Sequence, residues 1–179
     1  MEDNYIIKSE RLGFRNWRPS DIDEMFAINS DKDVMEFFPA FPTKEQTAEF
    51  IERMNNQFLD SKFCYFAVDK LENQEFIGFI GLSKQTYDAK FTPCIDIGWR
   101  IKSSEWNKGF ATGGAKRCLD YAFNDLEIGK VYSVAPKINI KILTLKILNN
   151  ILAIFFSLLA FLIAKLDGTN ESKDFKNFF

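Results

Sequence analysis

The segment over residues 105–115 constrains the fold more than any other part of the chain. It lies between an apolar strand pattern over residues 94–101 and an amphipathic helix pattern over residues 111–126. When a strand passes through a glycine-containing loop directly into a helix, several backbone N–H groups at the helix start have no partner. These donors and the positive end of the helix dipole favour a phosphate group, and Gly109 would let the backbone approach it closely.

The spacing of residues in this loop leaves more than one interpretation open. A Walker A loop needs a lysine directly after its last glycine, but Ala115 follows Gly114 and Lys116 comes one residue late. The G-x-G-x-x-G dinucleotide pattern is also absent. A tight strand-to-helix turn without a ligand remains the alternative. It does not explain why Gly113 and Gly114, each costing about 1 kcal/mol relative to alanine, occupy the first helical turns.

The rest of the chain predicts a mixed order of strands and helices. Ser20 is a candidate helix N-cap, and Thr43 with Gln46 forms a capping box before a second helical pattern. A chain of 179 residues with this order is expected to form one domain, residues 1–179, of the α/β (α+β) class. The expected strands cover residues 6–16, 63–70, 75–86, 94–101 and 131–136.

Composition excludes several classes of function. The chain has no histidine, so Ser-His-Asp and Cys-His catalysis are excluded and the commonest zinc ligand is missing. The net charge is −2 without a long basic block, so no nucleic-acid partner is expected. The cysteines Cys64, Cys94 and Cys118 form no C-x-x-C motif. We expect them to be buried small hydrophobic residues of a cytoplasmic protein that binds no metal.

Several motifs resemble those of one family. Residues 106–114 read W-N-K-G-F-A-T-G-G, similar to the acetyl-CoA loop W-G-K-G-Y-A-T-E-A of GNAT acetyltransferases, with Asn107 in place of a glycine and Gly-Gly in place of Glu-Ala. S-E-R-L-G-F-R at residues 9–15 resembles the opening T-E-R-L-x-L-R of the branch that acetylates protein N-termini, the Rim-type ribosomal-protein-alanine N-acetyltransferases. I-D-I-G-W at residues 95–99 resembles its A-E-I-G-Y strand, and the resemblance covers about residues 7–141.

This resemblance implies a GNAT fold, with a central mixed and mostly antiparallel sheet flanked by helices. It also implies transfer of an acetyl group from acetyl-CoA to a primary amine. In the family the pantetheine arm lies between two splayed parallel strands, here residues 97–101 and 131–136. The implied acetyl-CoA contacts are Trp99, Arg100 and Ile101 for the pantetheine and thioester, Asn107, Lys108, Gly109, Phe110, Ala111 and Thr112 for the pyrophosphate, Asn139 for the pantetheine, and Lys102, Lys108 and Lys141 as candidates for the phosphates.

The general base must be a carboxylate, a hydroxyl or a relayed water because the chain has no histidine. Asp96 is the preferred candidate, since the family places an acid there, and the shorter aspartate favours action through a water. The alternative is a structural ion pair between Asp96 and Arg100. The weaker candidates for the base are Glu36 and Glu105, and the aromatic residues that either wall an acceptor pocket or belong to the core are Trp17, Phe37, Phe38 and Phe41.

The C-terminal segment over residues 142–179 departs from the family pattern. Ile142 occupies a position where the family has a serine, and residues 151–164 are fourteen residues without a charge. That length is short of the roughly 20 residues that a membrane-spanning helix needs. A buried helix or strand pair is therefore favoured over a membrane tail anchor, and a damaged reading frame is a third alternative.

These observations predict an acetyl-CoA-dependent N-acetyltransferase, a monomer or homodimer, acting on a peptide or protein N-terminal amine. A small amine is the other acceptor considered. Two further functions stay open. The first is an acyl-CoA-binding protein with impaired catalysis, because the C-terminal segment is atypical. The second is a tail-anchored interaction protein built on the same scaffold.

Overall fold

The computed structural model describes residues 5–133 of the 179-residue chain. The chain divides between residues 138 and 139 into two units, and everything described here belongs to the first. The predictions for Asn139, Lys141 and the segment over residues 142–179 lie outside the described residues. They stay predictions.

The centre of the domain is a five-stranded antiparallel sheet with its strands in chain order. This architecture confirms the predicted fold class. The single strand expected over residues 6–16 was wrong, because the chain turns back there: the N–H of Ser9 donates to the carbonyl of Leu12, and the N–H of Leu12 donates to Oγ of Ser9. The strands are β1 (Ile7–Lys8), β2 (Leu12–Arg15), β3 (Tyr65–Lys70), β4 (Phe76–Gln85) and β5 (Cys94–Ile101).

The predicted helix starts are confirmed in position. Thr43 and Gln46 form the full capping box of the longest helix, with side chain to backbone bonds in both directions. Ser20 precedes the first helix but makes no side-chain cap bond; the carboxylate of Asp21 accepts the N–H of Arg18 there. The helices are α1 (Asp21–Ser30), α2 (Lys32–Met35), α3 (Lys44–Ser61), η1 (Ser103–Glu105), α4 (Phe110–Asp120) and the π-helical turn η2 (Tyr121–Asp125).

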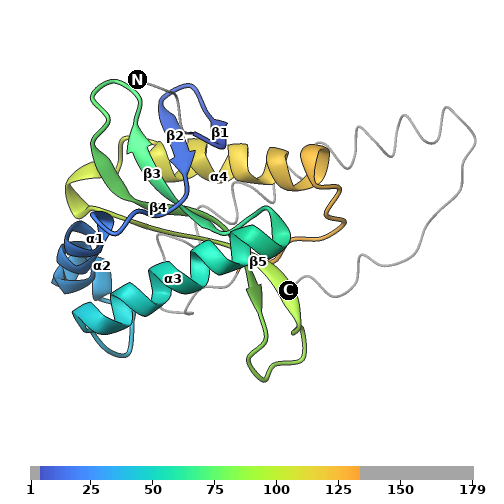
Figure 1. Ribbon diagram of the computed structural model, residues 1–179, viewed down its shortest axis with the longest axis horizontal. Helices are drawn as coiled ribbons and strands as arrows, with labels where there is room; N and C mark the ends of the chain where they lie inside the picture. The colour runs from blue at the N-terminus through green and yellow to red at the C-terminus, as the bar shows by residue number, and fades with distance from the viewer. Residues whose placement is uncertain (1–4, 134–179) are drawn as a thin grey trace, which may run out of the picture. The chain divides into compact units, whose positions relative to one another are not determined.

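Helices cover both faces of the sheet (Figure 1). On one face lie α1, α2 and α3; Gln57 of α3, for example, accepts a hydrogen bond from Ser83 of β4. On the other face lies α4, so close that a Cβ added to Gly114 would overlap the side chain of Ile80. This close approach explains Gly114. A Cβ on Gly113 would meet nothing within 4 Å, so packing within the described residues does not explain the second glycine.

A buried ionic network joins α1 to the sheet. The guanidinium of Arg15 donates to both carboxylate oxygens of Asp21 and to both of Asp69, at 2.7 to 3.0 Å. All three residues are almost fully buried, and the two carboxylates hold the pKa of Arg15 above its usual range even though burial opposes its charge. A buried arginine is stable here because every charge has a partner.

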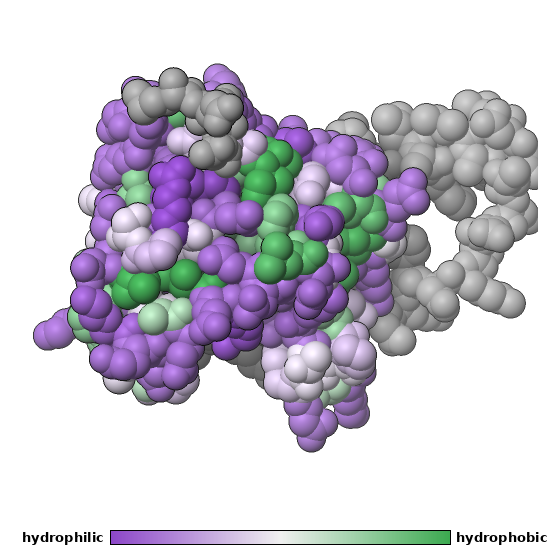
Figure 2. All heavy atoms as spheres, in the orientation of Figure 1, coloured by the Kyte–Doolittle hydropathy of each residue, from purple (hydrophilic) through white to green (hydrophobic). Residues whose placement is uncertain are grey.

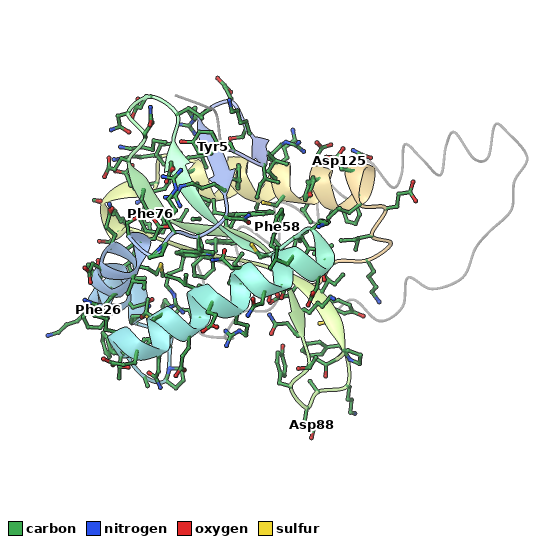
Figure 3. All side chains as sticks on the ribbon, in the orientation of Figure 1. Tyr5, Phe26, Phe58, Phe76, Asp88 and Asp125 are labelled. Atoms are coloured by element: carbon green, nitrogen blue, oxygen red, sulfur yellow. The ribbon has the colours of Figure 1, made fainter. Side chains whose placement is uncertain are left out.

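Aromatic side chains fill the layer between the sheet and α3. Trp17 lies edge-on to Phe50 and Phe76, and Phe79 stacks on Tyr65 with ring centroids 5.1 Å apart. Trp17 is buried, so it belongs to the core. Phe58 and Phe76 lie within the domain, whereas Asp88 at the tip of the β4–β5 connection points away from it (Figure 3).

The surface in Figure 2 is mostly polar, and the cysteines lie inside or partly inside the domain. Figure 2 shows polar residues over most of the viewed face, with apolar residues in small separate groups. Cys64 and Cys118 are buried as expected, Cys94 is half-buried, and all three are free thiols. Between residues 5 and 133 no helix has the length and apolar character needed to cross a bilayer, and no group of three acidic or cysteine residues is placed to hold a metal.

Candidate functional site

The glycine loop leads into α4 with backbone donors that have no acceptor within residues 5–133, as the sequence predicts. Gly109 is the N-cap in the left-handed region, with φ of 79°, and Asn107 is also left-handed, with φ of 63°. The N–H of Gly113 makes the first intrahelical bond, to the carbonyl of Gly109. The N–H groups of Phe110, Ala111 and Thr112 come before this bond and have no acceptor within the helix. Together they form a concentrated donor site at the positive end of the helix dipole.

The left-handed backbone at Asn107 accounts for its replacement of a glycine. Outside glycine, asparagine is one of the residues that best tolerate a positive φ, since its side chain is short and polar. The loop thus keeps the conformation that a glycine would adopt.

Arg11, on the turn between β1 and β2, contacts the glycine loop through its side chain. Its Nη2 donates to the carbonyl of Lys108 at 2.9 Å, and its guanidinium carbon lies 4.6 Å from the ring centroid of Phe110. The backbone carbonyl of Arg11 accepts the N–H of Leu71, which fixes its own position. Sequence analysis did not single out Arg11, although it is part of the S-E-R-L motif. The motif was recognised, but it does not reveal that Arg11 contacts Lys108, which is 97 residues away in the sequence.

Two of the three lysines considered for the CoA phosphates, Lys102 and Lys108, form ion pairs with carboxylates. Nζ of Lys108 lies 3.1 Å from Glu105, which is buried under the loop and also lies 3.7 Å from Lys70. Nζ of Lys102 lies 3.2 Å from Glu24 and 3.5 Å from Glu75. Glu105, one of the weaker candidates for the base, is thus held in ion pairs with two lysines beside the loop. Glu36, the other weaker candidate, is exposed at the end of α2.

The outer edge of β5 offers backbone donors next to this loop. The N–H of Ile97 donates to the carbonyl of Tyr132, and the N–H of Tyr132 donates to Ile95, which makes a parallel bridge. Because N–H groups alternate along an antiparallel strand, those of Trp99 and Ile101 point to this same edge. Neither has an acceptor within residues 5–133. The bridge at Tyr132 is the described part of the strand expected over residues 131–136.

The three residues expected to hold the pantetheine are therefore not equivalent. Arg100 pairs with Phe79 of β4, and its N–H points toward that strand, so its backbone is not available at the outer edge. The outer carbonyl of Ile101 accepts the indole N–H of Trp106 at 3.0 Å, which closes the edge at the start of the glycine loop. The available N–H donors are those of Trp99 and Ile101.

Asp96 lies on the α1–α3 face of β5 in a dehydrated, hydrogen-bonded setting. It is 8% exposed, and its Oδ1 accepts the hydroxyl of Tyr65 at 2.6 Å and Nε2 of Gln85 at 2.9 Å. Burial raises the pKa of Asp96 above its usual range, and the two hydrogen bonds oppose that rise. A carboxylate with a raised pKa is a better proton acceptor than an ordinary one. Sequence analysis missed Tyr65 and Gln85, which only the sheet brings beside Asp96.

The alternative of an ion pair between Asp96 and Arg100 was wrong. Nη1 of Arg100 donates to Oδ1 of Asn29 at 2.6 Å, and its guanidinium carbon lies 4.3 Å from the ring centroid of Phe38. Phe38 and Phe41 are 46% and 54% exposed and do not belong to the core. Of the four aromatic residues considered for the acceptor side, only Trp17 is buried, and Phe37 is half-buried.

Residues 11–145 match the family model described as an acetyltransferase (GNAT) domain. The chain belongs to this family. The uncharacterised N-acetyltransferase p20 of Bacillus licheniformis is 24% identical over 147 residues, which are 81% of this chain and 80% of that protein. The domain is therefore that of an acetyltransferase that transfers an acetyl group to an amine.

Solved structures of GNAT enzymes share the fold. The GNAT acetyltransferase from Bacillus anthracis has a TM-score of 0.63 and 25% identity, covering 75% of this chain and 76% of that one. The spermidine N-acetyltransferase from Vibrio cholerae, solved with CoA and spermine, has a TM-score of 0.59 and 23% identity, covering 75% and 77%. The fold of this GNAT protein is therefore one on which CoA and an amine are bound together in a relative.

Proposed function

We propose that this GNAT protein transfers the acetyl group of acetyl-CoA to the amino terminus of a peptide or protein, with Asp96 as the general base. The observation that carries the proposal is the position of Asp96 relative to the outer edge of β5. Asp96 and the outward N–H donors of Trp99 and Ile101 belong to one strand, which leads directly into the donor-rich loop at residues 107–112.

The loop is suited to the pyrophosphate of the cofactor. Unpaired N–H groups at the start of α4 can each donate to a phosphate oxygen, and the helix dipole adds to the attraction. Arg11 supplies a fixed positive charge beside the same loop. A Cβ added to Gly109 would lie 3.2 Å from Nη2 of Arg11. A glycine at this position therefore leaves room for the Arg11 guanidinium and for the pyrophosphate.

The chemistry needs positioning and removal of one proton. The thioester supplies an activated acetyl group, and holding it beside a neutral amine is worth up to roughly 7–11 kcal/mol in favourable cases. The edge N–H groups of Trp99 and Ile101 are the candidates for fixing the pantetheine and for stabilising negative charge on the acetyl oxygen. The new C–N bond forms as the C–S bond breaks, the amine proton passes to Asp96, directly or through a water, and the sulfur leaves as a thiolate.

An N-terminal amine is preferred as the acceptor because the motifs resemble the Rim-type branch over residues 9–15 and 95–99. The relative from Vibrio cholerae was solved with spermine, which makes a polyamine the second candidate. A protein that binds acetyl-CoA but lacks catalysis is the third. Turnover with an amine distinguishes it from the first two.

The deciding experiment is a turnover screen of the full chain. Free thiol released from acetyl-CoA would be followed with N-terminal peptides, polyamines and small amines, and CoA binding would be measured separately by calorimetry. We expect CoA binding and thiol release that depends on an N-terminal peptide. Absence of CoA binding by the folded protein would overturn the proposal, whereas binding without turnover of any amine would support the impaired acyl-CoA-binding protein.

A further inference from the structure

Two arginines of the domain have different surroundings, since Arg15 is buried and Arg100 is half-buried. Arg15 is enclosed by Asp21 and Asp69, and its five donors meet two carboxylates and a backbone carbonyl. Arg100 lies within 4.0 Å of no carboxylate in residues 5–133, and its Nε is buried without a hydrogen-bond partner. Buried polar atoms in proteins normally have a hydrogen-bond partner, so the buried Nε of Arg100, on a cation with no carboxylate partner in the described residues, requires a reason.

Neutral groups hold the Arg100 side chain in place. Its partner Asn29 is buried and is itself fixed, since Nδ2 of Asn29 donates to Oγ1 of Thr47. The rings of Phe38 and Phe79 lie 4.3 and 5.7 Å from the guanidinium carbon. These contacts orient the cation without neutralising it, and burial lowers the pKa of Arg100 to about 10, so the side chain stays charged at neutral pH.

Arg100 also shares a face of the sheet with the proposed base. Side chains alternate along a strand, so Asp96, Gly98 and Arg100 of β5 all point to the α1–α3 face. Asp96 and Arg100 are four residues apart on an extended strand, so their Cα atoms lie about 13 Å apart. The ring of Tyr65 lies over Gly98 between them, since a Cβ added to Gly98 would meet that ring at 3.0 Å, and the exposed ring of Phe38 covers the guanidinium. An extended peptide with its amine near Asp96 would therefore pass over the Tyr65 ring and reach Arg100 with the side chain of its second or third residue.

We propose that the Arg100 guanidinium binds a carboxylate of the acceptor, so that this enzyme prefers amines that carry an acidic group close to the reacting amine. This inference rests on the proposed function and narrows its acceptor class. A peptide with aspartate or glutamate as its second or third residue fits, because the planar guanidinium binds a carboxylate with two parallel hydrogen bonds. A polyamine such as spermine does not fit, because its positive charges would meet an unneutralised cation.

Matched acceptor peptides test the inference. The acceptors are Ala-Asp-Ala-Ala amide and Ala-Asn-Ala-Ala amide, a second pair with the acidic residue moved to the third position, and spermine. We expect kcat/KM for the acidic member of one pair to exceed that of its neutral twin by roughly 10-fold or more. Equal values for both pairs, or a higher kcat/KM for spermine than for every acidic peptide, would overturn the inference.

Variants show whether Arg100 is responsible. Arg100→Gln should remove the preference for the acidic twin, and Arg100→Lys should restore part of it. The control is Arg53→Gln, which removes an exposed arginine that lies over Phe50 and should leave the preference intact. An acidic preference that survives in folded Arg100→Gln contradicts the proposal. If Arg100→Gln does not fold, the wild-type comparison of twins still decides.

CoA binding separates this inference from the proposed function. If the protein binds CoA and acetylates both twins equally, only the inference fails. If it binds no CoA, the proposed function fails as well. Calorimetric binding of the two twins to the CoA-loaded protein gives the same comparison without turnover, and tighter binding of the acidic twin is expected.

Discussion

The hydroxyl of Tyr65 lies 2.6 Å from Oδ1 of Asp96, reaching across strand β4 to a residue on β5. Nε2 of Gln85 donates to the same carboxylate oxygen at 2.9 Å and to the Tyr65 hydroxyl at 3.1 Å. Both hydrogen bonds stabilise the ionised carboxylate, while burial destabilises it. The balance between these effects sets the pH at which Asp96 can accept a proton.

Asp96→Asn removes the basic group while keeping its size. We expect kcat to fall by roughly 10²–10⁴-fold while CoA affinity stays near the wild-type value. The pKa of Asp96 is higher in the folded than in the unfolded protein, so its ionised form lowers the free energy of unfolding at neutral pH. This destabilisation disappears as the pH falls and the carboxylate becomes protonated. The variant should therefore melt at no lower temperature than the wild type. An unchanged kcat under conditions limited by chemistry would exclude Asp96 as the base.

Tyr65→Phe tests the hydrogen bond itself. Loss of the hydroxyl removes a contact that lowers the pKa of Asp96, so that pKa should rise further. A base works only when deprotonated, and the acidic limb of the kcat/KM profile should therefore move to higher pH. The control is Tyr87→Phe, which changes an exposed tyrosine on the neighbouring hairpin. A limb at the same pH in both variants would show that Tyr65 does not tune the base.

Ala111→Asp tests the phosphate site at the start of α4. A carboxylate placed against the pyrophosphate should abolish CoA binding in calorimetry through charge repulsion and bulk. Ala111→Ser adds a small neutral group at the same position and should retain binding. Equal CoA affinity of Ala111→Asp and the wild type would move the cofactor site away from this loop.

Arg11→Gln tests whether the contacts of Arg11 with residues 108–110 order the glycine loop. It removes the hydrogen bond to the Lys108 carbonyl and the contact with Phe110, so we expect the KM for acetyl-CoA to rise about 10-fold with a smaller change in kcat. Arg117→Gln is the matched control, because Arg117 also donates to a backbone carbonyl, that of Lys8, away from the loop. Equal KM values for acetyl-CoA in the two variants would show that Arg11 does not order the loop.

Adjacent glycines of α4 should respond differently to alanine. Gly113→Ala adds a methyl group into open space and should stabilise the fold by about 1 kcal/mol through helix propensity. Gly114→Ala gains the same propensity but forces Ile80, which is fully buried, to move, at a cost of about 1–3 kcal/mol. Urea unfolding should therefore show Gly113→Ala to be the more stable variant. The reverse order would mean that α4 packs less closely on the sheet than described.

Local chemistry made much of the fold predictable. The capping box at Thr43 and Gln46, the strand over residues 94–101 and the loop around Gly109 depend on contacts within a few residues, and each appears at its expected place. The exception is the first strand, which the sequence pattern alone presented as one element. Two hydrogen bonds between Ser9 and Leu12 turn it into a hairpin.

The sequence by itself determined the family, the donor-rich loop and the candidate base, because motifs and periodicity are local properties. Only the tertiary structure decided which side chains surround them. Tyr65 meets Asp96 across 31 residues and Arg11 meets Lys108 across 97, and both contacts exist because the sheet aligns strands that are distant in sequence. The same alignment leaves Arg15 fully paired, whereas Arg100 has no carboxylate partner within residues 5–133. Two arginines that look alike in a sequence thus acquire different roles, since the energy of a buried charge depends on which partners the fold brings within reach.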